Sequence, residues 1–180
     1  MNPSAPAETS PVRAKPIAYV LVGLPGSGKS TWAASHPERL PVASTDAFVE
    51  AYAAKNQLTY AEAFKQHFSQ AKLLFKQRLN ELIAANAAFI WDQPNITARK
   101  RRAVYNKLHP THRVVFVCFC VPIDICIARV EERKRKAGEF INSNLIKLWS
   151  SMVTFPERGE PADGIIPIIH PAFSNQSKNN

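Results

Sequence analysis

The sequence predicts an α/β fold in which a parallel sheet of about five strands is flanked by helices on both faces. Three observations favour this class. Short runs rich in β-branched residues alternate along the chain with segments of helical periodicity. The first of these runs is apolar at almost every position, as expected for a strand that is covered on both faces. A glycine-rich motif follows that run and opens a helix, which is the arrangement of a phosphate-binding strand–loop–helix unit.

The first strand is predicted over Ile17–Val22. The glycine-rich turn after it leads into a helix that cannot extend past Pro37, because the residue before a proline disfavours helical backbone. A short second strand is predicted over residues 41–44, and a helix follows over residues 47–55.

The longest helix is predicted over residues 60–86. Thr59 and Glu62 have the spacing of a capping box, in which each side chain bonds a backbone N–H of the other residue. Apolar residues then recur at steps of three and four, which places them on one helical face. We expect a core face made of Phe64, Phe68, Ala71, Phe75, Leu79 and Leu82.

A third strand is predicted over residues 88–91 and ends at Asp92. Thr97 is suited to cap the basic helix that follows it, which reaches about Leu108. Strand, carboxylate and helix thus follow one another without a long loop.

The fourth strand, residues 113–121, carries Cys118 and Cys120 on one face, where we interpret them as small core residues. Pro122 opens the next helix, and a fifth strand is predicted over Gly164–Ile169. Between them lies a helix near residues 144–153, whose predicted inner side consists of Leu145, Leu148, Trp149 and Met152.

All of these elements fall within one predicted domain, residues 16–171. Residues 1–15 are rich in proline and small residues and lack apolar periodicity, so we predict a disordered tail there. Residues 172–180 have a similar polar composition and are predicted to form a second disordered tail.

The chain is expected to be cytoplasmic and to have no membrane partner. No run approaches the ~18 consecutive apolar residues of a transmembrane helix. The N-terminal segment lacks the apolar core of a secretory signal. Three cysteines, Cys118, Cys120 and Cys126, are too few and too clustered for a disulfide framework or a zinc site.

The charge favours polyanionic partners such as nucleotides or nucleic acid. Lys and Arg number 23 against 14 Asp and Glu, a formal net charge of +9. The excess is concentrated in two clusters, one from Arg99 to Arg113 and one from Arg129 to Lys136. Either cluster could also be an ordinary solvated helix face.

Residues 23–30 read GLPGSGKS, a complete phosphate-binding P-loop of the form G-x-x-x-x-G-K-[ST]. Glycines let successive backbone N–H groups turn toward phosphate oxygens, and the helix N-terminus adds partial positive charge. In such loops the lysine, here Lys29, reaches the β- and γ-phosphates, while the hydroxyl of Ser30 ligates Mg²⁺. The expected nucleotide contacts are Gly23, Pro25, Gly26, Ser27, Gly28, Lys29, Ser30 and Thr31.

The remaining pattern favours an ATP-dependent phosphotransferase among the P-loop proteins. The core is too small to include the helical lid domain of an oligomeric ATPase motor. The N-K-x-D motif with which GTPases read guanine does not occur in the sequence. Catalysis by a small P-loop phosphotransferase consists mostly of positioning and charge neutralisation, which suits a basic chain.

Two aspartates follow predicted strands, where the carboxyl ends of an α/β sheet face the ligand crevice. Asp46, after the second strand, is a candidate catalytic base, and its alternative role is helix N-cap. Asp92 ends an apolar strand as a Walker B acid does, so we expect it to hold Mg²⁺ or its water shell with Ser30. A turn-forming aspartate is the alternative for Asp92.

Residues 129–138 are expected to form an arginine-bearing lid at the end of a helix. Closure of such a lid excludes water, and an arginine in it can be worth ~10³–10⁵ in rate. The sequence does not choose among Arg129, Arg133 and Arg135. Arg133 is our candidate catalytic residue and Arg129 our candidate nucleotide contact.

Four segments together resemble the kinase domain of phage-type polynucleotide 5′-kinases and, more widely, the small zeta-toxin-like and AAA-type P-loop kinases. They are GLPGSGKSTWA at residues 23–33, Ser44-Thr45-Asp46, WDQPN at residues 91–95 and the arginine-rich lid. The resemblance covers about residues 17–155. It implies a P-loop kinase fold, ATP or another NTP as donor, and the 5′-hydroxyl of DNA or RNA as acceptor.

The same resemblance implies roles for individual residues. Asp46 would be the general base, and Asp92 and Asn95 would match an acid-Thr-Asn turn in which Pro94 replaces the threonine. An arginine that often lies three residues after the base, touching the acceptor, is Val49 in this chain. The acceptor contacts implied here are Asp46 and Asn95, with Arg99 and Arg102 substituting for the missing arginine.

Three functions fit these observations. The first is a polynucleotide 5′-kinase, favoured by the net charge of +9. The second is a kinase of a nucleoside, nucleotide or sugar nucleotide, favoured by Val49. The third is an NTP-binding switch without an acceptor, which would require Asp46 to be only a helix cap.

Overall fold

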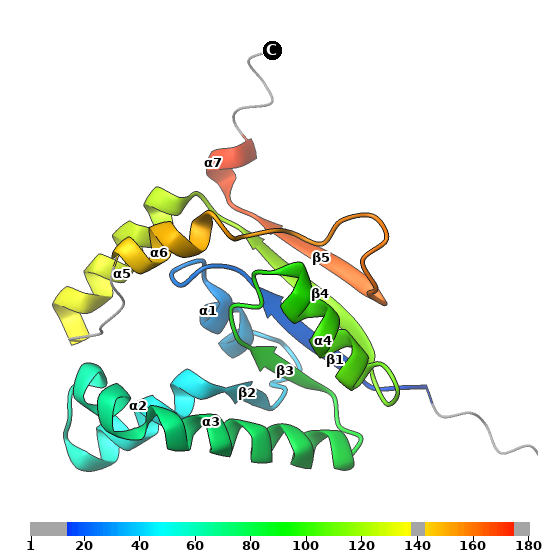
Figure 1. Ribbon diagram of the computed structural model, residues 1–180, viewed down its shortest axis with the longest axis horizontal. Coiled ribbons are helices and arrows are strands. Elements are labelled where there is room, and N and C mark those ends of the chain that lie inside the picture. Colours follow the sequence, from blue (N-terminus) through cyan, green and yellow to red (C-terminus); the bar gives the residue numbers. More distant parts are fainter. Residues whose placement is uncertain (1–13, 138–142, 175–180) are drawn as a thin grey trace, which may run out of the picture.

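The computed structural model describes residues 14–137 and 143–174. Every strand and helix that the sequence predicts is present, with boundaries shifted by a few residues, and a short C-terminal helix is added (Figure 1). The elements are β1 (Ile17–Val22), α1 (Lys29–Ala34), β2 (Val42–Ser44), α2 (Thr45–Asn56), α3 (Tyr60–Ala84), β3 (Phe89–Asp92), α4 (Ala98–Leu108), β4 (Arg113–Cys120), α5 (Ile123–Ala137), α6 (Ser143–Ser150), β5 (Gly164–Ile169) and α7 (Pro171–Ser174).

The predicted tails, residues 1–15 and 172–180, lie mostly outside the described residues. Of the C-terminal one, residues 172–174 belong to α7, so this helix replaces the start of the predicted tail. At the N-terminal side, the Lys15 ammonium donates a hydrogen bond of 2.7 Å to the carbonyl oxygen of His109.

The five strands form one sheet in the order β2-β3-β1-β4-β5, and every pair of neighbours is parallel. This confirms the predicted α/β class with a parallel sheet of five strands. The register places Ser44 of β2 opposite Asp92 of β3, and Val20 of β1 opposite Trp91. The carboxyl ends of β1, β2 and β3 therefore meet at one edge of the sheet, where ligands bind in open α/β folds.

Two apolar clusters cover the two faces of the sheet. On one face, α3 and α4 pack through Leu79, Leu82, Val104 and Leu108 against strand residues such as Phe116. The opposite face is covered by α1 and includes Leu21, Ala33, Ile90, Val117 and Phe119. Side chains alternate along β1 between the two clusters, which explains why this strand is apolar at successive positions.

The capping box predicted for the longest helix is present. Thr59 Oγ1 accepts a hydrogen bond from the backbone N–H of Glu62, and the backbone N–H of Thr59 donates to Glu62 Oε2 at 2.8 Å. Helix α3 is paired with α2 through a third cluster of small buried residues, Val49, Ala53, Ala63 and Ala71. The cap therefore fixes the start of the helix that forms one side of the site described below.

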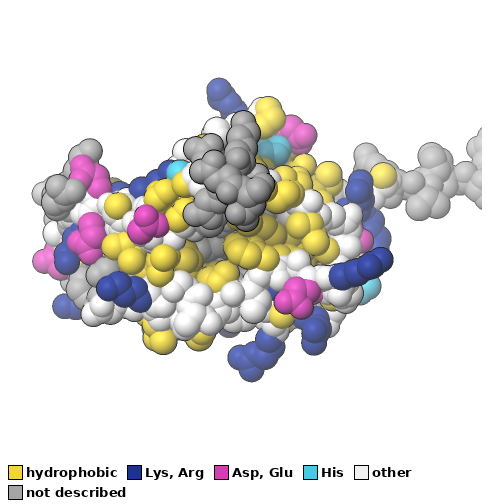
Figure 2. Space-filling model, turned by 90° about the horizontal axis from the view of Figure 1, so that it is seen from above, with side chains coloured by type: hydrophobic (Ala, Val, Ile, Leu, Met, Phe, Trp, Pro, Cys, Tyr) yellow, Lys and Arg dark blue, Asp and Glu magenta, His cyan; other side chains and the backbone are white. Residues whose placement is uncertain are grey.

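The inner face predicted for α6 is right for Trp149, which packs on the cluster under α5, and wrong for Leu145, Leu148 and Met152. Ile146 is fully buried against Cys126 and Val130 of α5, whereas Leu148 is 58% exposed and Leu145 is 38% exposed. The helix carries two apolar rows, and the row that packs on α5 contains Ile146 and Trp149. Figure 2 shows hydrophobic side chains on the surface that includes α6 and β5.

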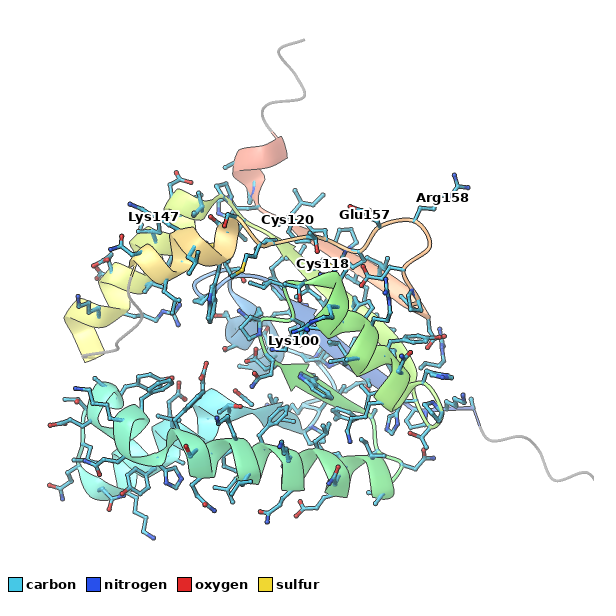
Figure 3. All side chains as sticks on the ribbon, viewed as in Figure 1. Lys100, Cys118, Cys120, Lys147, Glu157 and Arg158 are labelled. Atoms are coloured by element: carbon cyan, nitrogen blue, oxygen red, sulfur yellow. The ribbon has the colours of Figure 1, made fainter. Side chains whose placement is uncertain are left out.

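The interpretation of Cys118 as a core residue is confirmed, since its side chain is buried in the cluster under α3 and α4. Cys120, at the end of β4, is only half-buried. Figure 3 labels both residues and shows Arg158 extending away from the body of the protein on the loop before β5.

Within residues 14–137 and 143–174, no helix is both long and apolar enough to cross a membrane.

Candidate active site

The P-loop connects β1 to α1 as a tight turn at the edge of the sheet. Gly26 and Gly28 have φ angles of +81° and +98°, in the left-handed region that favours glycine. A Cβ at Gly26 would collide with the carbonyl oxygen of Cys126 on α5, so the loop passes this helix closely. Both glycines are therefore required by the path of the backbone.

Lys29 is the first residue of α1, and its side chain is buried within the loop. Its ammonium donates a hydrogen bond of 2.9 Å to the carbonyl oxygen of Leu24. Burial lowers the pKa of Lys29, and the carboxylates of Asp92 and Asp46 partly oppose this shift. The lysine charge thus lies between the P-loop and the two aspartates that the sequence singled out.

Ser30 and Asp92 meet as the sequence predicts. Ser30 Oγ donates a hydrogen bond of 3.0 Å to Asp92 Oδ2, although 62 residues separate the two in the chain. Asp92 is the last residue of β3 and is buried, which raises its pKa, while Lys29 and the Ser30 hydroxyl lower it in part. Two hard oxygen ligands at the P-loop are a suitable partial set for Mg²⁺, which prefers oxygen and keeps several waters and phosphate oxygens.

Asp46 lies in the first turn of α2 but does not cap this helix. The N-cap is Ser44, whose Oγ accepts a hydrogen bond of 3.4 Å from the backbone N–H of Ala47. The Asp46 carboxylate is exposed, and its Oδ1 accepts a hydrogen bond of 3.2 Å from the hydroxyl of Tyr60 on α3. The capping alternative for Asp46 is therefore wrong, and its carboxylate is directed by a tyrosine instead.

A second contact joins the ends of β2 and β3. The side chain of Gln93 donates a hydrogen bond of 2.7 Å to Thr45 Oγ1. Thr45 is the first residue of α2 and Gln93 follows Asp92, so this bond ties the start of α2 to the acid at the end of β3. It helps to fix Asp46 relative to Asp92.

A cleft of about 1130 Å³ opens over the P-loop, with α2 and α3 on one side and α5 and α6 on the other (Figure 1). The predicted residues that line it include the P-loop from Pro25 to Thr31, Asp46, Asp92, Arg129 and Arg133. Lining residues that the sequence did not assign to the site include Thr45, Tyr60, Phe64, Phe68, Gln93, Leu145 and Trp149.

Helix α5 brings two predicted lid arginines to the cleft. Arg129 and Arg133 are one helical turn apart, and both line the cleft. Arg129 Nη1 donates a hydrogen bond of 3.2 Å to the carbonyl oxygen of Gly26 in the P-loop. The side chain of the third candidate, Arg135, lies outside the described residues, and so does residue 138 at the end of the predicted lid.

Asn95 differs from its expected role as an acceptor contact. It is fully buried, and its side-chain amide donates hydrogen bonds to the carbonyl oxygens of Leu21, at 2.8 Å, and Gln93, at 3.1 Å. Its φ of +45° lies in the left-handed region, which asparagine tolerates better than most residues. Asn95 therefore fixes the turn after Asp92 to β1 and does not line the cleft.

The basic cluster on α4 is split between interior and surface. Arg101 is fully buried and forms an ion pair of 2.7 Å with Glu160, because it shares the inward helical face of Val104 and Leu108. Arg99 and Arg102 are exposed, and neither is among the described residues that line the cleft. The two arginines of α4 that were expected to contact the acceptor, Arg99 and Arg102, thus lie outside the cleft, and Arg101 is used inside the fold.

Val49, where the resemblance implies an arginine, is fully buried between α2 and α3. This position points into the helix interface and away from the cleft. Tyr60, Phe64 and Phe68 could not be assigned to the site from the sequence, since an apolar row on a helix ordinarily predicts core packing. Tyr60 follows a cap and Phe64 and Phe68 continue at helical spacing, so only the tertiary arrangement exposes them to the cleft.

Comparisons with known proteins agree with this architecture. Residues 19–154 match a protein family described as an AAA domain. A search of curated proteins found no significant match. Among solved structures, a candidate kinase from Chloroflexus aurantiacus superposes with a TM-score of 0.65 and 16% identity over 91% of this chain and 90% of that one.

Two further structures share the fold. One is a chain of the Pnkp1/Rnl/Hen1 RNA repair complex, with a TM-score of 0.60 and 20% identity, covering 83% of this chain and 46% of that one. The other is a sugar kinase from Janibacter, with a TM-score of 0.54 and 20% identity over 91% of both chains. At such identities these likenesses establish the fold.

Proposed function

Because the chain belongs to the AAA-domain family matched by residues 19–154 and has the fold of the P-loop kinases, we propose that it transfers the γ-phosphoryl group of ATP, or another NTP, to a hydroxyl group. One observation carries the proposal. Ser30 and Asp92 are hydrogen-bonded at 3.0 Å beside Lys29, and the exposed carboxylate of Asp46 faces the same cleft.

The donor side of the reaction uses the P-loop. Its backbone N–H groups and the ammonium of Lys29 would neutralise the β- and γ-phosphates. Ser30 and Asp92 would hold Mg²⁺, which supplies charge neutralisation on the phosphate oxygens when it is bound. The buried Asp92, with its raised pKa, gains a compensating positive charge in that state.

On the acceptor side, Asp46 would accept the proton of the attacking hydroxyl. The acceptor oxygen then forms a bond to the γ-phosphorus as the bond from that phosphorus to the β,γ-bridging oxygen breaks, and the nucleoside diphosphate leaves. Arg133, and Arg129 next to it on α5, would balance the charge that spreads over the transferring group.

For the acceptor we propose the 5′-hydroxyl of a nucleic acid. The net charge of +9 supports a polyanionic partner, and a structural neighbour is part of an RNA repair complex. A small-molecule kinase is the second candidate. It is favoured by the burial of Val49, Asn95 and Arg101, none of which reaches the cleft, and by the likeness to a sugar kinase over 91% of both chains.

The experiment is a phosphate-transfer assay with γ-labelled ATP and Mg²⁺. The acceptors are 5′-hydroxyl oligonucleotides of DNA and RNA, a panel of nucleosides, and sugars with sugar acids. We expect label on the oligonucleotides and none with Lys29→Ala, which removes the point charge at the phosphates. Transfer to sugars alone would support the second candidate, and the absence of transfer to every acceptor would contradict a kinase.

A further inference from the structure

The hydroxyl of Tyr60 joins two neighbouring helices at the candidate base. From the first residue of α3 it donates a hydrogen bond of 3.2 Å to Oδ1 of Asp46, which lies in the first turn of α2, 14 residues earlier in the chain. Both residues line the cleft over the P-loop. The bond therefore reaches the carboxylate that receives the proton in the proposed reaction.

The backbone around Asp46 is held by its neighbours, but its side chain is not. Ser44 caps α2, and the side chain of Thr45 accepts a hydrogen bond from Gln93. The Asp46 carboxylate is exposed, and within the described residues the Tyr60 hydroxyl is the one group that donates a hydrogen bond to it. An exposed aspartate without a partner can adopt several rotamers, so this bond selects among them.

Tyr60 is itself well anchored. Thr59 and Glu62 form the capping box that fixes the start of α3, and Tyr60 follows the cap directly. Its ring is half-buried against the cluster of small residues between α2 and α3. The ring centroid lies 6.0 Å from that of Phe64, one turn along the helix. The hydroxyl is thus presented to Asp46 by a side chain whose position is set by packing.

The bond leaves one carboxylate oxygen for the reaction. Oδ1 of Asp46 accepts from Tyr60, whereas Oδ2 accepts no hydrogen bond from the part of the chain that the structure describes. Because both oxygens belong to one planar group, holding Oδ1 limits where Oδ2 can lie. A general base must come within about 2.6–3.2 Å of the group whose proton it takes. A misplacement of about 1 Å can cost ~10² in rate.

We propose that Tyr60 is a positioning residue for the general base, whose hydroxyl holds the Asp46 carboxylate so that Oδ2 receives the proton of the acceptor hydroxyl. This inference rests on the proposed phosphotransferase function and adds a residue to it. The proton moves to Oδ2 as the acceptor oxygen bonds the γ-phosphorus, while the bond to the β,γ-bridging oxygen breaks and the nucleoside diphosphate leaves. Tyr60 transfers no proton in this step and acts through Asp46.

The test is a double-mutant cycle of Tyr60→Phe and Asp46→Asn, measured by steady-state kinetics with the best acceptor from the transfer assay. Tyr60→Phe keeps the ring and its packing and removes the hydroxyl alone. Asp46→Asn keeps the shape of the side chain but cannot receive the proton. If Tyr60 acts through the base, its hydroxyl should affect kcat only while the carboxylate is present.

Tyr52→Phe is the matched control. Tyr52 lies on α2, and its hydroxyl donates a hydrogen bond of 3.5 Å to Oε1 of Gln66 on α3, so this bond also joins the two helices. Tyr52 is not among the described residues that line the cleft. The control therefore reports the effect of losing a tyrosine hydroxyl between α2 and α3 away from the base. Thermal unfolding of each variant identifies any loss of folded protein.

We expect Tyr60→Phe to lower kcat roughly 10- to 100-fold, the range of one hydrogen bond to a charged group. KM for ATP and for the acceptor should hardly change, because the lost bond is made to Asp46 and to neither substrate. The same change in the Asp46→Asn background should leave kcat nearly unaltered, and Tyr52→Phe should leave it near the wild-type value. Crystal structures, which need no acceptor, should show the Asp46 carboxylate in one orientation in the wild type and displaced or in several orientations in Tyr60→Phe.

An unchanged kcat in Tyr60→Phe, or an equal loss of kcat in both backgrounds, would overturn the inference. A raised acceptor KM with normal kcat would overturn it too, since Tyr60 would then be a substrate contact, and so would an unchanged orientation of Asp46 in Tyr60→Phe. The proposed function fails separately. If the wild type phosphorylates no acceptor, yet the orientation of Asp46 depends on Tyr60, the kinase assignment is wrong and the positioning of the carboxylate stands.

Discussion

Ser44 and Asp46 have different roles at the start of α2, one as the helix cap and the other as a carboxylate at the cleft, although either residue type can cap a helix. Ser44 supplies the cap of α2 through its bond to the N–H of Ala47, which leaves the carboxylate of Asp46 at the cleft beside Tyr60. Ser44 ends the short strand β2 and Asp46 lies two residues after it, and both belong to residue types that favour helix starts. The choice between them depends on a one- or two-residue difference in where the helix begins.

Replacing Asp46 by asparagine separates catalysis from structure. The amide is nearly isosteric and retains an oxygen for the Tyr60 hydroxyl, but it cannot accept the acceptor's proton. We expect kcat to fall by at least ~10², since general-base assistance is typically worth ~10²–10⁴. The melting temperature should hardly change, because Ser44 holds the cap. Steady-state kinetics and thermal unfolding test this, and a destabilised variant with normal kcat would contradict it.

Lys29, Ser30 and Asp92 could be predicted because each belongs to a short motif whose chemistry is local. The serine and the aspartate then meet at 3.0 Å because adjacent parallel strands end together. Asn95 could not be predicted in the same way. The partner of its side chain, the carbonyl oxygen of Leu21, is 74 residues away, so nothing nearby in the sequence shows that the amide is used inside the fold.

At the scale of elements, α5 carries the two arginines at the cleft in different settings. Arg129 is bonded to the Gly26 carbonyl, so its removal should mainly alter the P-loop and raise KM for ATP. We expect Arg133→Ala to lower kcat by at least ~10², as a charge-neutralising arginine can be worth ~10³–10⁵. Arg133→Lys should restore part of the rate. A larger kcat loss in Arg129→Ala than in Arg133→Ala would reverse the two roles.

Helix faces were harder to predict than helix positions. The capping box gave the start of α3, and its inner residues Leu79 and Leu82 are buried as expected. At the N-terminal end of α3 the same apolar pattern, Tyr60, Phe64 and Phe68, lines the cleft. On α6 the buried row contains Ile146 in place of Leu148. Periodicity defines an apolar stripe, but whether the stripe meets a sheet, a neighbouring helix or a cleft depends on tertiary packing.

Arg101 connects α4 to the loop before β5 and to the turn after Asp92. Its guanidinium donates to both carboxylate oxygens of Glu160, at 2.7 and 2.8 Å, to the carbonyl oxygen of Thr154 at 2.5 Å, and to that of Asn95 at 3.3 Å. A basic residue in a charged run is normally solvated, so the sequence pattern does not indicate that Arg101 is buried and bonded in this way. Its carboxylate partner lies 59 residues further along the chain.

We expect Arg101→Ala to destabilise the protein by about 3–5 kcal/mol, because it leaves the Glu160 carboxylate buried without its counter-charge. Replacing both residues, as Arg101→Met with Glu160→Gln, should cost less than Arg101→Ala alone. Urea unfolding of the single and double variants measures the difference. The matched control is the exposed neighbour Arg102→Ala, which should change stability by no more than ~0.5 kcal/mol. Equal effects of Arg101→Ala and Arg102→Ala on the free energy of unfolding would contradict a stabilising role of the Arg101–Glu160 ion pair.

For the whole molecule, buried His112 should make stability depend on pH. Its ring is fully buried and bonds the Ala87 carbonyl at 3.0 Å and Thr111 Oγ1 at 2.8 Å. Burial lowers the pKa of His112, so the folded state favours the neutral ring. The unfolded chain, with a histidine pKa near ~6.5, binds more protons below that pH.

The stability that neutral His112 contributes is therefore present above about pH 6.5 and is lost as the pH falls toward the lowered folded-state pKa. We expect the melting temperature to fall more between pH 7.5 and pH 5.5 in the wild type than in His112→Gln, which has no titrating ring. The other histidines are common to both proteins, so their contributions to the pH dependence of the melting temperature cancel in the comparison. Parallel melting curves across this range would contradict the expectation.

The net charge of +9 is a property of the whole surface, and its value for function depends on whether the acceptor is a polymer. Each phosphate contact with a single strand releases counterions and contributes about −0.7 to the log–log slope of affinity against salt. If three or four phosphates are bound, the slope is about −2 to −3 by the same rule. A nucleoside has no backbone phosphate and should show a nearly flat line.

We expect KM for a 5′-hydroxyl oligonucleotide to rise steeply between low and physiological salt, while KM for a nucleoside acceptor changes little. Exposed Arg99 and Arg102 lie on α4 outside the cleft, so they can meet only a chain that extends beyond the acceptor site. The double variant Arg99→Ala with Arg102→Ala should reduce the salt slope for a long oligonucleotide and leave that of a dinucleotide unchanged. The measurement is KM against salt for both lengths, with Lys107→Ala at the far end of α4 as the control. A flat line for the long oligonucleotide would show that the positive charge does not serve acceptor binding, and a nucleoside would then be the better substrate.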